Sequence, residues 1–314
     1  LNLREKVNEH YLAQHHGGDA DQIDQLELNG NVLEGSNDHY IALRDFIASK
    51  DLTNAENYAW VQSQMEVENF ITYQAVQIYT DNRDWPGNNI KYWRPQTEGG
   101  RWRWILFDTE WGFGINAYAS GNAYAYNTLA FATSPTQTPG LHGNPPWSTL
   151  LLRRLLLNPD FKRSFINRFA DLMNSAYRET ATVAHIDSLE SLLSGDMTRH
   201  YDKWRQQVWW SSARLWWNSM DSWYGYIRTL RDFALNRPGY MRAHLMQKFA
   251  ITSVVSLRLF CDPAQGGEIL LNDFLPVRSS PWSGSYFSGV PVKLTARPAP
   301  GYIFAGWEIG RAHV

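Results

Sequence analysis

Two short stretches of the chain concentrate oxygen-bearing side chains that could do chemistry. One is "NRDWPGNN", residues 82–89, and the other is "FDTEWGFG", residues 107–114. The candidate side chains are Asp84, Asn88, Asn89, Asp108 and Glu110. Carboxylate and amide oxygens are ligands that suit divalent cations such as Mg²⁺, and a carboxylate can also accept a proton from an attacking hydroxyl group.

The order of these residues is the order that phosphoryl transfer requires. One carboxylate must receive or orient the attacking hydroxyl, while an amide oxygen and a second carboxylate hold Mg²⁺ against the nucleotide phosphates. In protein kinases the catalytic aspartate and the metal-binding asparagine stand five apart on one loop, as Asp84 and Asn89 do. In kinases a hairpin then leads to the metal-binding aspartate ahead of Phe-Gly, and here Asp108 precedes Phe113-Gly114.

The elements that must position these residues are a helix before the loop and a hairpin between the two stretches. Residues 1–80 are predicted to be mainly helical, and Thr53 and Glu56 form a capping-box pattern. The apolar residues at helical spacing before the loop are Phe70, Ile71, Ala75 and Ile78. The alternation in "NIKYWR" and "RWRWILF", with the turn "PQTEGG" between them, predicts a β-hairpin over about 89–107.

A loop and a helical region follow the hairpin. Residues 115–147 are rich in Ala, Asn, Thr, Pro and Gly, which predicts a long irregular loop. Asn158 and Pro159 are typical of the cap and first position of a helix, whose apolar face is predicted to be Phe161, Phe165, Phe169 and Leu172. Further helices are predicted near 180–194, 196–209, 220–235 and 238–248.

From about residue 251 the pattern changes to β. The strand-like runs are "VVSLRLFC", "GGEILLN", "GVPVKLTARP" and "GYIFAGW", separated by Gly and Pro. A domain boundary is therefore predicted near residue 250.

The two central motifs together resemble the CotH family, the spore-coat protein H-like atypical protein kinases of bacteria. The family pattern is roughly Asn-x-Asp, a short turn, Asn-Asn, an aromatic hairpin and Asp-x-Asp-x-x-Phe-Gly, which stands here as "NRDWPGNNIKYW" and "FDTEWGFG". "NLREKV", "NAENYAWV" and "NPDFKRSFINRFADL" also resemble family segments, so the likeness covers about residues 1–250. The expected fold is α+β, with a mostly helical kinase-like C-lobe and its catalytic hairpin, then a small all-β, Ig-like or β-repeat domain over 251–307.

The resemblance implies a role for each candidate. Asp84 corresponds to the catalytic aspartate, Asn89 to the metal-binding asparagine with Asn88 as a second candidate, and Asp108 to the metal-binding aspartate. Glu110 stands where the family more often has aspartate; glutamate also binds Mg²⁺, but its extra methylene moves the carboxylate. The implied cofactors are ATP and Mg²⁺ or Mn²⁺, and the implied substrate is the Ser or Thr hydroxyl of a protein.

Kinases cover the nucleotide phosphates with an N-terminal lobe that carries a glycine-rich loop and a strand lysine. The chain contains no GxGxxG, and no lysine is predicted on a strand ahead of a helix. If "NLREKV" is hinge-like, the chain begins where that lobe ends. We therefore expect the chain alone to fold in its helical part, to bind metal weakly and not to transfer phosphate.

Composition narrows the function classes. The 314 residues are 44% hydrophobic and 19% charged with a net charge of −2, as in an ordinary globular protein. No basic stripe exists to neutralise nucleic-acid phosphates, and no apolar run approaches the roughly 20 residues of a membrane helix. The single cysteine, Cys261, cannot form an internal disulfide.

Two competing hypotheses remain open. The 15 tryptophans include the clusters "VWWSSARLWW" and "DSWYGY", which could stack on sugars in a secreted carbohydrate-binding or carbohydrate-active protein with cell-surface polysaccharide as a partner. Asp108 and Glu110 would then be its carboxylates, although glycosidase carboxyls flank the scissile bond from opposite sides. The other hypothesis is a degenerate kinase-fold scaffold. Asp81, His15 and His16 are expected to be surface residues.

The C-terminal part bears on location. The run "VPVKLTARPAPGYIFAGW" is similar to the small β repeats of bacterial surface proteins, so we expect a secreted or cell-surface protein whose β domain is incomplete here. Residues Ile309–Val314 spell what a common sequencing-library adapter encodes in one frame. Residues 308–314 are therefore expected to be foreign to the fold.

Overall fold

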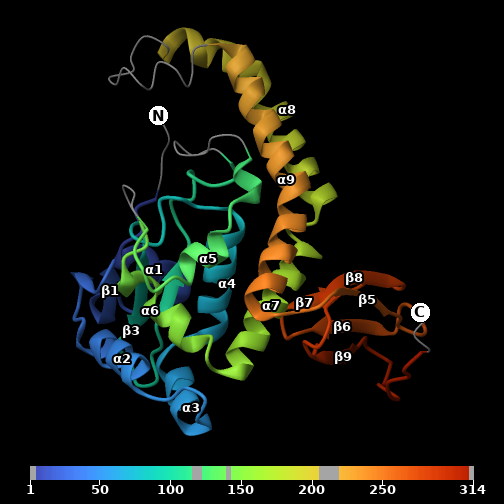
Figure 1. Ribbon diagram of the computed structural model, residues 1–314, viewed down its shortest axis with the longest axis horizontal. Helices are drawn as coiled ribbons and strands as arrows, with labels where there is room; N and C mark the ends of the chain where they lie inside the picture. The colour runs from blue at the N-terminus through green and yellow to red at the C-terminus, as the bar shows by residue number, and fades with distance from the viewer. Residues whose placement is uncertain (1–4, 115–121, 139–142, 205–218, 311–314) are drawn as a thin grey trace.

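The computed structural model describes residues 5–114, 122–138, 143–204 and 219–310. Its architecture is α+β, as the sequence predicts: helices and one antiparallel sheet come first, and two small antiparallel sheets follow (Figure 1). The helices are α1 (Glu9–His16), α2 (Asp38–Ser49), α3 (Ala55–Gln64), α4 (Val67–Tyr79), α5 (Thr128–Ala132), α6 (Pro146–Leu155), α7 (Pro159–Met173), α8 (Glu179–Trp204) and α9 (Met220–Phe249), with short 3₁₀ turns η1 (Ala20–Gln22) and η2 (Ala123–Ala125).

The first sheet contains the predicted hairpin. Strands β3 (Lys91–Pro95) and β4 (Arg103–Ile105) pair antiparallel within the predicted 89–107 segment. Two further strands, β1 (Ile23–Glu27) and β2 (Asn31–Glu34), extend the sheet in the order β2-β1-β3-β4. The prediction that residues 1–80 are mainly helical is therefore wrong for the segment that forms β1 and β2.

Strand β1 is not predicted from the sequence pattern, because four of its five residues are buried and these include the polar Asp24 and Gln25. The carboxylate of Asp24 accepts hydrogen bonds from Arg94 Nε at 2.8 Å, Gln96 Nε2 at 2.8 Å and the Ser36 amide at 2.9 Å. These partners offset the cost of burying the charge. A strand with polar residues on its buried side lacks the alternation that indicates a strand.

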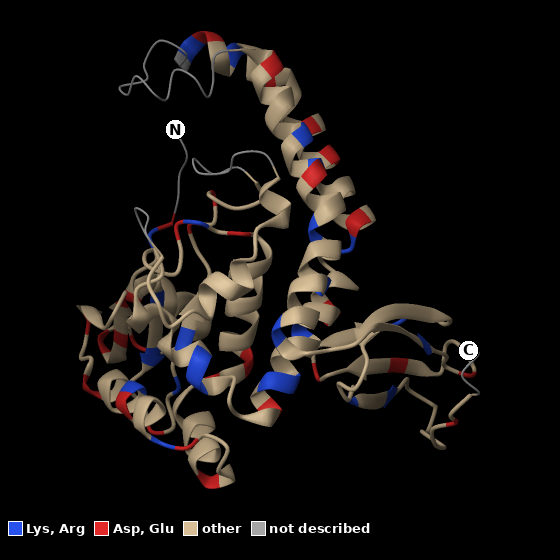
Figure 2. Cartoon of the chain, in the orientation of Figure 1, with Lys and Arg blue, Asp and Glu red and all other residues tan. Residues whose placement is uncertain are grey.

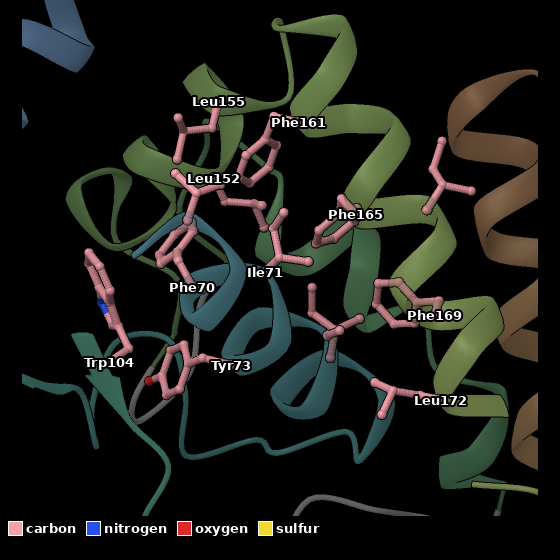
Figure 3. Packing of buried hydrophobic residues seen from close by; sticks show 14 of the residues in the cluster. Phe70, Ile71, Tyr73, Trp104, Leu152, Leu155, Phe161, Phe165, Phe169 and Leu172 are labelled. Carbon is pink, nitrogen blue, oxygen red and sulfur yellow. The ribbon is translucent and has the colours of Figure 1, made fainter. Parts of the chain in front are cut away.

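The core lies where α4 meets α6 and α7 (Figure 3). The predicted apolar faces of α4 and α7 are confirmed, since Phe70, Ile71, Ala75, Ile78, Phe161, Phe165, Phe169 and Leu172 are all buried. Asn158 caps α7 by accepting hydrogen bonds from the amides of Asp160 and Phe161, with Pro159 at the first helical position. In α3 the cap is Asn54, one residue beyond the predicted Thr53.

Helices α8 and α9 form a long antiparallel pair that extends beyond the rest of the helical region (Figure 1). Each is continuous where the sequence predicts a break, at Gly195 in α8 and at residues 236–237, just before Pro238, in α9. Proline in a helix interior removes one backbone hydrogen bond and disfavours the helix. Here Pro238 is buried together with Met241 and Ala234, so tertiary packing outweighs that preference.

The C-terminal strands form two small sheets. Strand β5 (Val254–Leu259) pairs with β8 (Trp282–Phe287), and β6 (Gly267–Leu271) lies between β7 (Leu275–Val277) and β9 (Leu294–Pro298). The predicted strand at 301–307 is wrong, because these residues form no strand and their large side chains are exposed. The boundary near 250 and the Ig-like or repeat nature of this part stay predictions.

The β region packs on α7 through a buried polar group. Asp171 accepts hydrogen bonds from Tyr286 Oη at 2.6 Å and from Asn272 Nδ2 at 3.0 and 3.1 Å. Asn174 and Ser285 exchange two further hydrogen bonds at 2.9 Å. Leu271 and Tyr286 also belong to the same buried apolar cluster as α7, so the sheets share the core of the helical region.

Charges of both signs are interspersed over the described chain, with no extended basic stripe (Figure 2). Within the described residues, no helix is both long enough and apolar enough to cross a bilayer.

Candidate active site

The loop that carries Asp84 begins at the end of α4. Thr80 is the C-cap of the helix, and Asp81 then turns the chain with a left-handed φ of 54°. Asn82 is fully buried and is hydrogen-bonded to Gln77 on α4. Its backbone amide donates to Gln77 O at 3.2 Å, and its Nδ2 donates to Gln77 Oε1 at 2.8 Å. Asn82 Oδ1 accepts a hydrogen bond from the Asp84 amide at 3.1 Å, so the helix end fixes the backbone of Asp84.

The structure brings three of the predicted site residues together. The two oxygens of the Asp84 carboxylate accept hydrogen bonds from Asn88 Nδ2 at 3.1 Å and from Asn89 Nδ2 at 2.7 Å. Because each asparagine presents its Nδ2 to Asp84, its Oδ1 is the atom left for another ligand. Among the described residues, neither Oδ1 accepts a hydrogen bond from a protein group.

The second motif is attached to the first through backbone contacts. The Phe113 amide donates to Thr80 O at 2.7 Å, and Asn82 Nδ2 lies 3.5 Å from Asp108 O. A Cβ at Gly112 would lie 2.9 Å from Thr80 O, closer than real Cβ atoms come, so glycine is required there. The segment that starts at Asp108 is therefore held against the C-terminal end of α4.

Unusual backbone conformation is concentrated in this unit. Among the described residues, eight non-glycine residues have positive φ, and four of them lie here: Asp81, Asn89, Asp108 and Phe113. Such conformations are uncommon, cost of order 1–3 kcal/mol each and gather at functional sites. At Asn89 and Asp108 they fall on two predicted cation ligands.

Asp108 and Glu110 are exposed. Among the described residues, no three acidic, histidine or cysteine side chains gather as a metal-binding cluster. The oxygens offered by Asp84, Asn89 and Asp108 are nonetheless the type that Mg²⁺ and Mn²⁺ prefer, and Mg²⁺ in phosphoryl-transfer sites is held by one or two carboxylates together with substrate phosphates. The residues present therefore fit a metal–nucleotide complex better than a free metal ion.

The prediction that Asp81 is a surface residue is wrong. It is fully buried rather than solvated, and Thr128 Oγ1 donates to its Oδ1 at 2.5 Å, with Arg83 Nη1 at 3.3 Å from the same oxygen. Burial raises the pKa of its carboxyl, and the positive charges of Arg237 and Arg83 oppose that shift. Asp81, three residues before Asp84, is thus part of a buried charge cluster.

Lys91 is a residue that sequence reasoning missed. It lies on β3, two residues after Asn89, and its Nζ is 5.1 Å from the centre of the Phe107 ring, which directly precedes Asp108. The other hairpin cations, Arg94, Arg101 and Arg103, form ion pairs with Asp24 or Glu66. Within the described part of the chain, Lys91 forms none.

The structure also places the two adjacent histidines and some of the tryptophans considered in the sequence. His15 and His16 are exposed, as predicted. The buried tryptophans are Trp85, Trp93, Trp102, Trp104 and Trp223, which act as core residues. Trp223 is the tryptophan of "DSWYGY", whereas "VWWSSARLWW" lies outside the described residues.

A helix that ends in an acid-amide loop, a hairpin and a second acidic segment are the parts of a kinase-like phosphotransferase. Comparison with protein families agrees: the family described as CotH kinase protein matches residues 2–241. The match covers most of the chain, which therefore belongs to the CotH kinase family. A comparison with curated protein sequences finds no match.

Proposed function

We propose that this protein is a CotH-type protein kinase that transfers the γ-phosphate of ATP to Ser or Thr hydroxyls of an exported or surface protein. The observation that carries the proposal is the pairing of Asp84 with Asn89, five residues on, next to the segment that begins at Asp108. Family membership supports the kinase class, and the substrate class is the further step proposed here.

In this proposal each residue has a distinct role. Asp84 orients the attacking hydroxyl and accepts its proton, a task for a carboxylate within hydrogen-bond reach of the acceptor. Asn89 and Asp108 would hold Mg²⁺ or Mn²⁺, with Asn88 and Glu110 as additional oxygen ligands. When bound, the cation neutralises charge on the β- and γ-phosphates.

The hydrogen bonds of Asp84 bear on its role. An aspartate that accepts two amide hydrogen bonds is held in one orientation, and positioning is a large part of catalysis in phosphoryl transfer. The same two bonds use the Nδ2 atoms of Asn88 and Asn89, which leaves their Oδ1 atoms as the proposed cation ligands. The loop thus prepares the base and the cation ligands together.

Lys91 is the proposed phosphate contact. Its ammonium group lies beside Phe107 at the Asp108 end of the hairpin, and no described acid competes for it. A lysine acts as a compact point charge for phosphate. Lys91 therefore supports nucleotide binding from the hairpin itself.

The proposed location is the cell surface or the exterior. Its support is the likeness of "VPVKLTARPAPGYIFAGW" to repeats of bacterial surface proteins. Fractionation of the source cells, with detection of this chain by antibody, tests that location.

The function is tested by nucleotide-dependent thermal stabilisation in parallel with polysaccharide pull-down. The kinase proposal predicts that ATP with Mg²⁺ or Mn²⁺ raises the melting temperature, that EDTA abolishes the effect, and that the complete gene product labels a protein substrate. Metal-dependent ATP binding without labelling would support a scaffold. Polysaccharide retention without nucleotide binding would support the carbohydrate-binding alternative.

A further inference from the structure

One fully buried cation lies behind the candidate active site. Arg237, on α9, donates to Tyr79 O at 2.8 Å and Ile78 O at 2.7 Å, the carbonyls of the last turn of α4. It also donates to Tyr124 O at 2.9 Å and Tyr126 O at 2.7 Å, in the segment after Phe113-Gly114. A single guanidinium therefore joins two chain segments that lie about 45 residues apart in the sequence.

The acid associated with this cation is Asp81. Thr128 Oγ1 accepts a hydrogen bond from Arg237 Nη2 at 3.1 Å and donates to Asp81, so the hydroxyl bridges the two charges. Arg83 completes the cluster, with its guanidinium 3.3 Å from the centre of the Tyr126 ring. Asp81 Oδ2 is buried and accepts no hydrogen bond within the described chain, so the cluster is not fully satisfied.

The cluster connects to Asp84 through a short path. Arg237 fixes the carbonyls of Ile78 and Tyr79, and after Thr80 come the left-handed Asp81 and the buried Asn82. Asn82 in turn binds the Asp84 amide. Arg237 therefore acts on Asp84 only through backbone and other side chains.

The same helix also holds the second motif. Phe113 packs against Phe233, one turn before Arg237, with ring centres 5.0 Å apart. A Cβ at Gly114 would lie 3.2 Å from Thr229 on α9. Helix α9 thus contacts the end of α4, just before Asp84, and the residues that follow Asp108.

We infer that Arg237 is a positioning residue of the site: from α9 it sets the Asp84 loop against the segment that follows Phe113-Gly114. The expected effect of Arg237 on turnover rests on the proposed phosphoryl transfer. Its expected effect on the position of the Asp84 loop does not. A planar guanidinium has five donors, enough for all four of the carbonyls that Arg237 binds, whereas an ammonium group has three and cannot serve all four at once. Isolated buried charges are costly, and such groups can be retained because they specify one arrangement.

Arg237→Lys separates positioning from mere stability. It keeps the charge but replaces the five-donor guanidinium with a three-donor ammonium group, so the two segments lose hydrogen bonds that hold them together. Hydrogen exchange of this chain should become faster in residues 80–89 and 122–128, while α7 keeps its protection. The matched control is Arg242→Lys on the same helix, because Arg242 forms an ion pair with Glu179 at 3.9 Å and contacts neither segment through a described hydrogen bond. It should exchange like the unmodified chain.

Turnover of the complete gene product is the second readout. Displacement of about 1 Å can cost about 10²-fold in rate, so Arg237→Lys should lower kcat by about that factor, with KM for ATP changed less than about threefold. A loss confined to KM would contradict positioning of the base. If no variant and no unmodified protein transfers phosphate, the proposed function fails, and the exchange result still decides the positioning claim.

Thr128→Val tests the same inference in case Arg237→Lys does not fold. It removes only the hydroxyl between Arg237 and Asp81 and preserves the size of the side chain. It should also accelerate exchange in residues 80–89, by a smaller factor than Arg237→Lys. Unchanged exchange in both variants, or acceleration spread uniformly over α7 and the loop, would overturn the inference.

Discussion

The carboxylate of Asp84 and the amide of Asn89 form a 2.7 Å hydrogen bond that makes the proposed base and a proposed cation ligand one unit. Asn89 reaches Asp84 from a left-handed conformation with φ 51°. A substitution at either residue therefore alters the orientation of the other. The role of each residue is therefore best tested with variants that keep the size and shape of its side chain.

Asp84→Asn tests the base. The amide keeps one oxygen to accept a hydrogen bond from Asn89 but cannot take a proton. A positioned general base contributes about 10²–10⁴ in rate, roughly 3–5 kcal/mol of barrier, so turnover of the complete gene product should fall by that much. Affinity for ATP with Mg²⁺ should be nearly unaltered, as measured by titration calorimetry.

The control for Asp84→Asn is Asp45→Asn, which removes an exposed carboxylate that pairs with Arg44 on α2. Its turnover should equal that of the unmodified protein. Normal turnover in Asp84→Asn would remove Asp84 from the mechanism.

Lys91→Met tests the proposed phosphate contact. Hydrogen bonds to charged groups contribute about 1.5–3 kcal/mol, so ATP affinity should fall about tenfold to a hundredfold, and its dependence on salt should weaken. Arg101→Met is the control on the same hairpin, because Arg101 is paired with Glu66 at 2.6 Å. Equal ATP affinity in the two variants would show that Lys91 does not contact phosphate.

Asp171 should make stability depend on pH. Burial raises the pKa of its carboxyl to about 6, against the opposing effect of its hydrogen bonds from Tyr286 and Asn272. A raised pKa in the folded state means that this stability is fully present below about pH 4, the unfolded value, and is lost as pH rises through 6. Integrated over that interval, the loss is about 3 kcal/mol.

The measurement for Asp171 is urea unfolding at pH 4 and pH 7. Relative to Asp171→Asn, the unmodified chain should lose up to about 3 kcal/mol of unfolding free energy between these pH values. Asp160→Asn, an exposed site on the same helix, controls for the lost charge. A constant difference between the unmodified chain and Asp171→Asn at both pH values would show that Asp171 does not titrate there.

Sequence patterns predict well the elements whose signals are local. The face of α7 and its cap at Asn158 follow from apolar spacing and capping chemistry, and the β3–β4 hairpin follows from alternation around a turn. The contact of Asp84 with Asn89 follows from their spacing on one loop.

Tertiary packing decided what the patterns missed. Strand β1 buries polar residues whose partners, such as Arg94, lie about 70 residues away. Helix α9 continues through Pro238 because both sides of the proline are packed. The segment 301–307 has the composition of a strand but no neighbouring strand in the described chain, and backbone groups need such a partner.

The sequence names candidate site residues, but it does not reveal the residues that support them. Asp81 looks like a loop charge in the sequence, and only the fold brings Thr128 and Arg237 to it. Lys91 looks like one more hairpin cation. Only the structure shows that its neighbours form ion pairs, whereas Lys91 forms none with the residues that the structure describes.

The central claim is that Asp108 belongs to a metal-dependent nucleotide site, and calorimetric titration of ATP with Mg²⁺ or Mn²⁺ into the complete gene product tests it most directly. The unmodified protein and Glu98→Gln, which removes an exposed acid from the hairpin turn, should bind ATP only when metal is present. Asp108→Asn should lose this metal-dependent binding while its circular dichroism is unchanged. Equal metal-dependent affinity in Asp108→Asn and the unmodified protein would contradict the account.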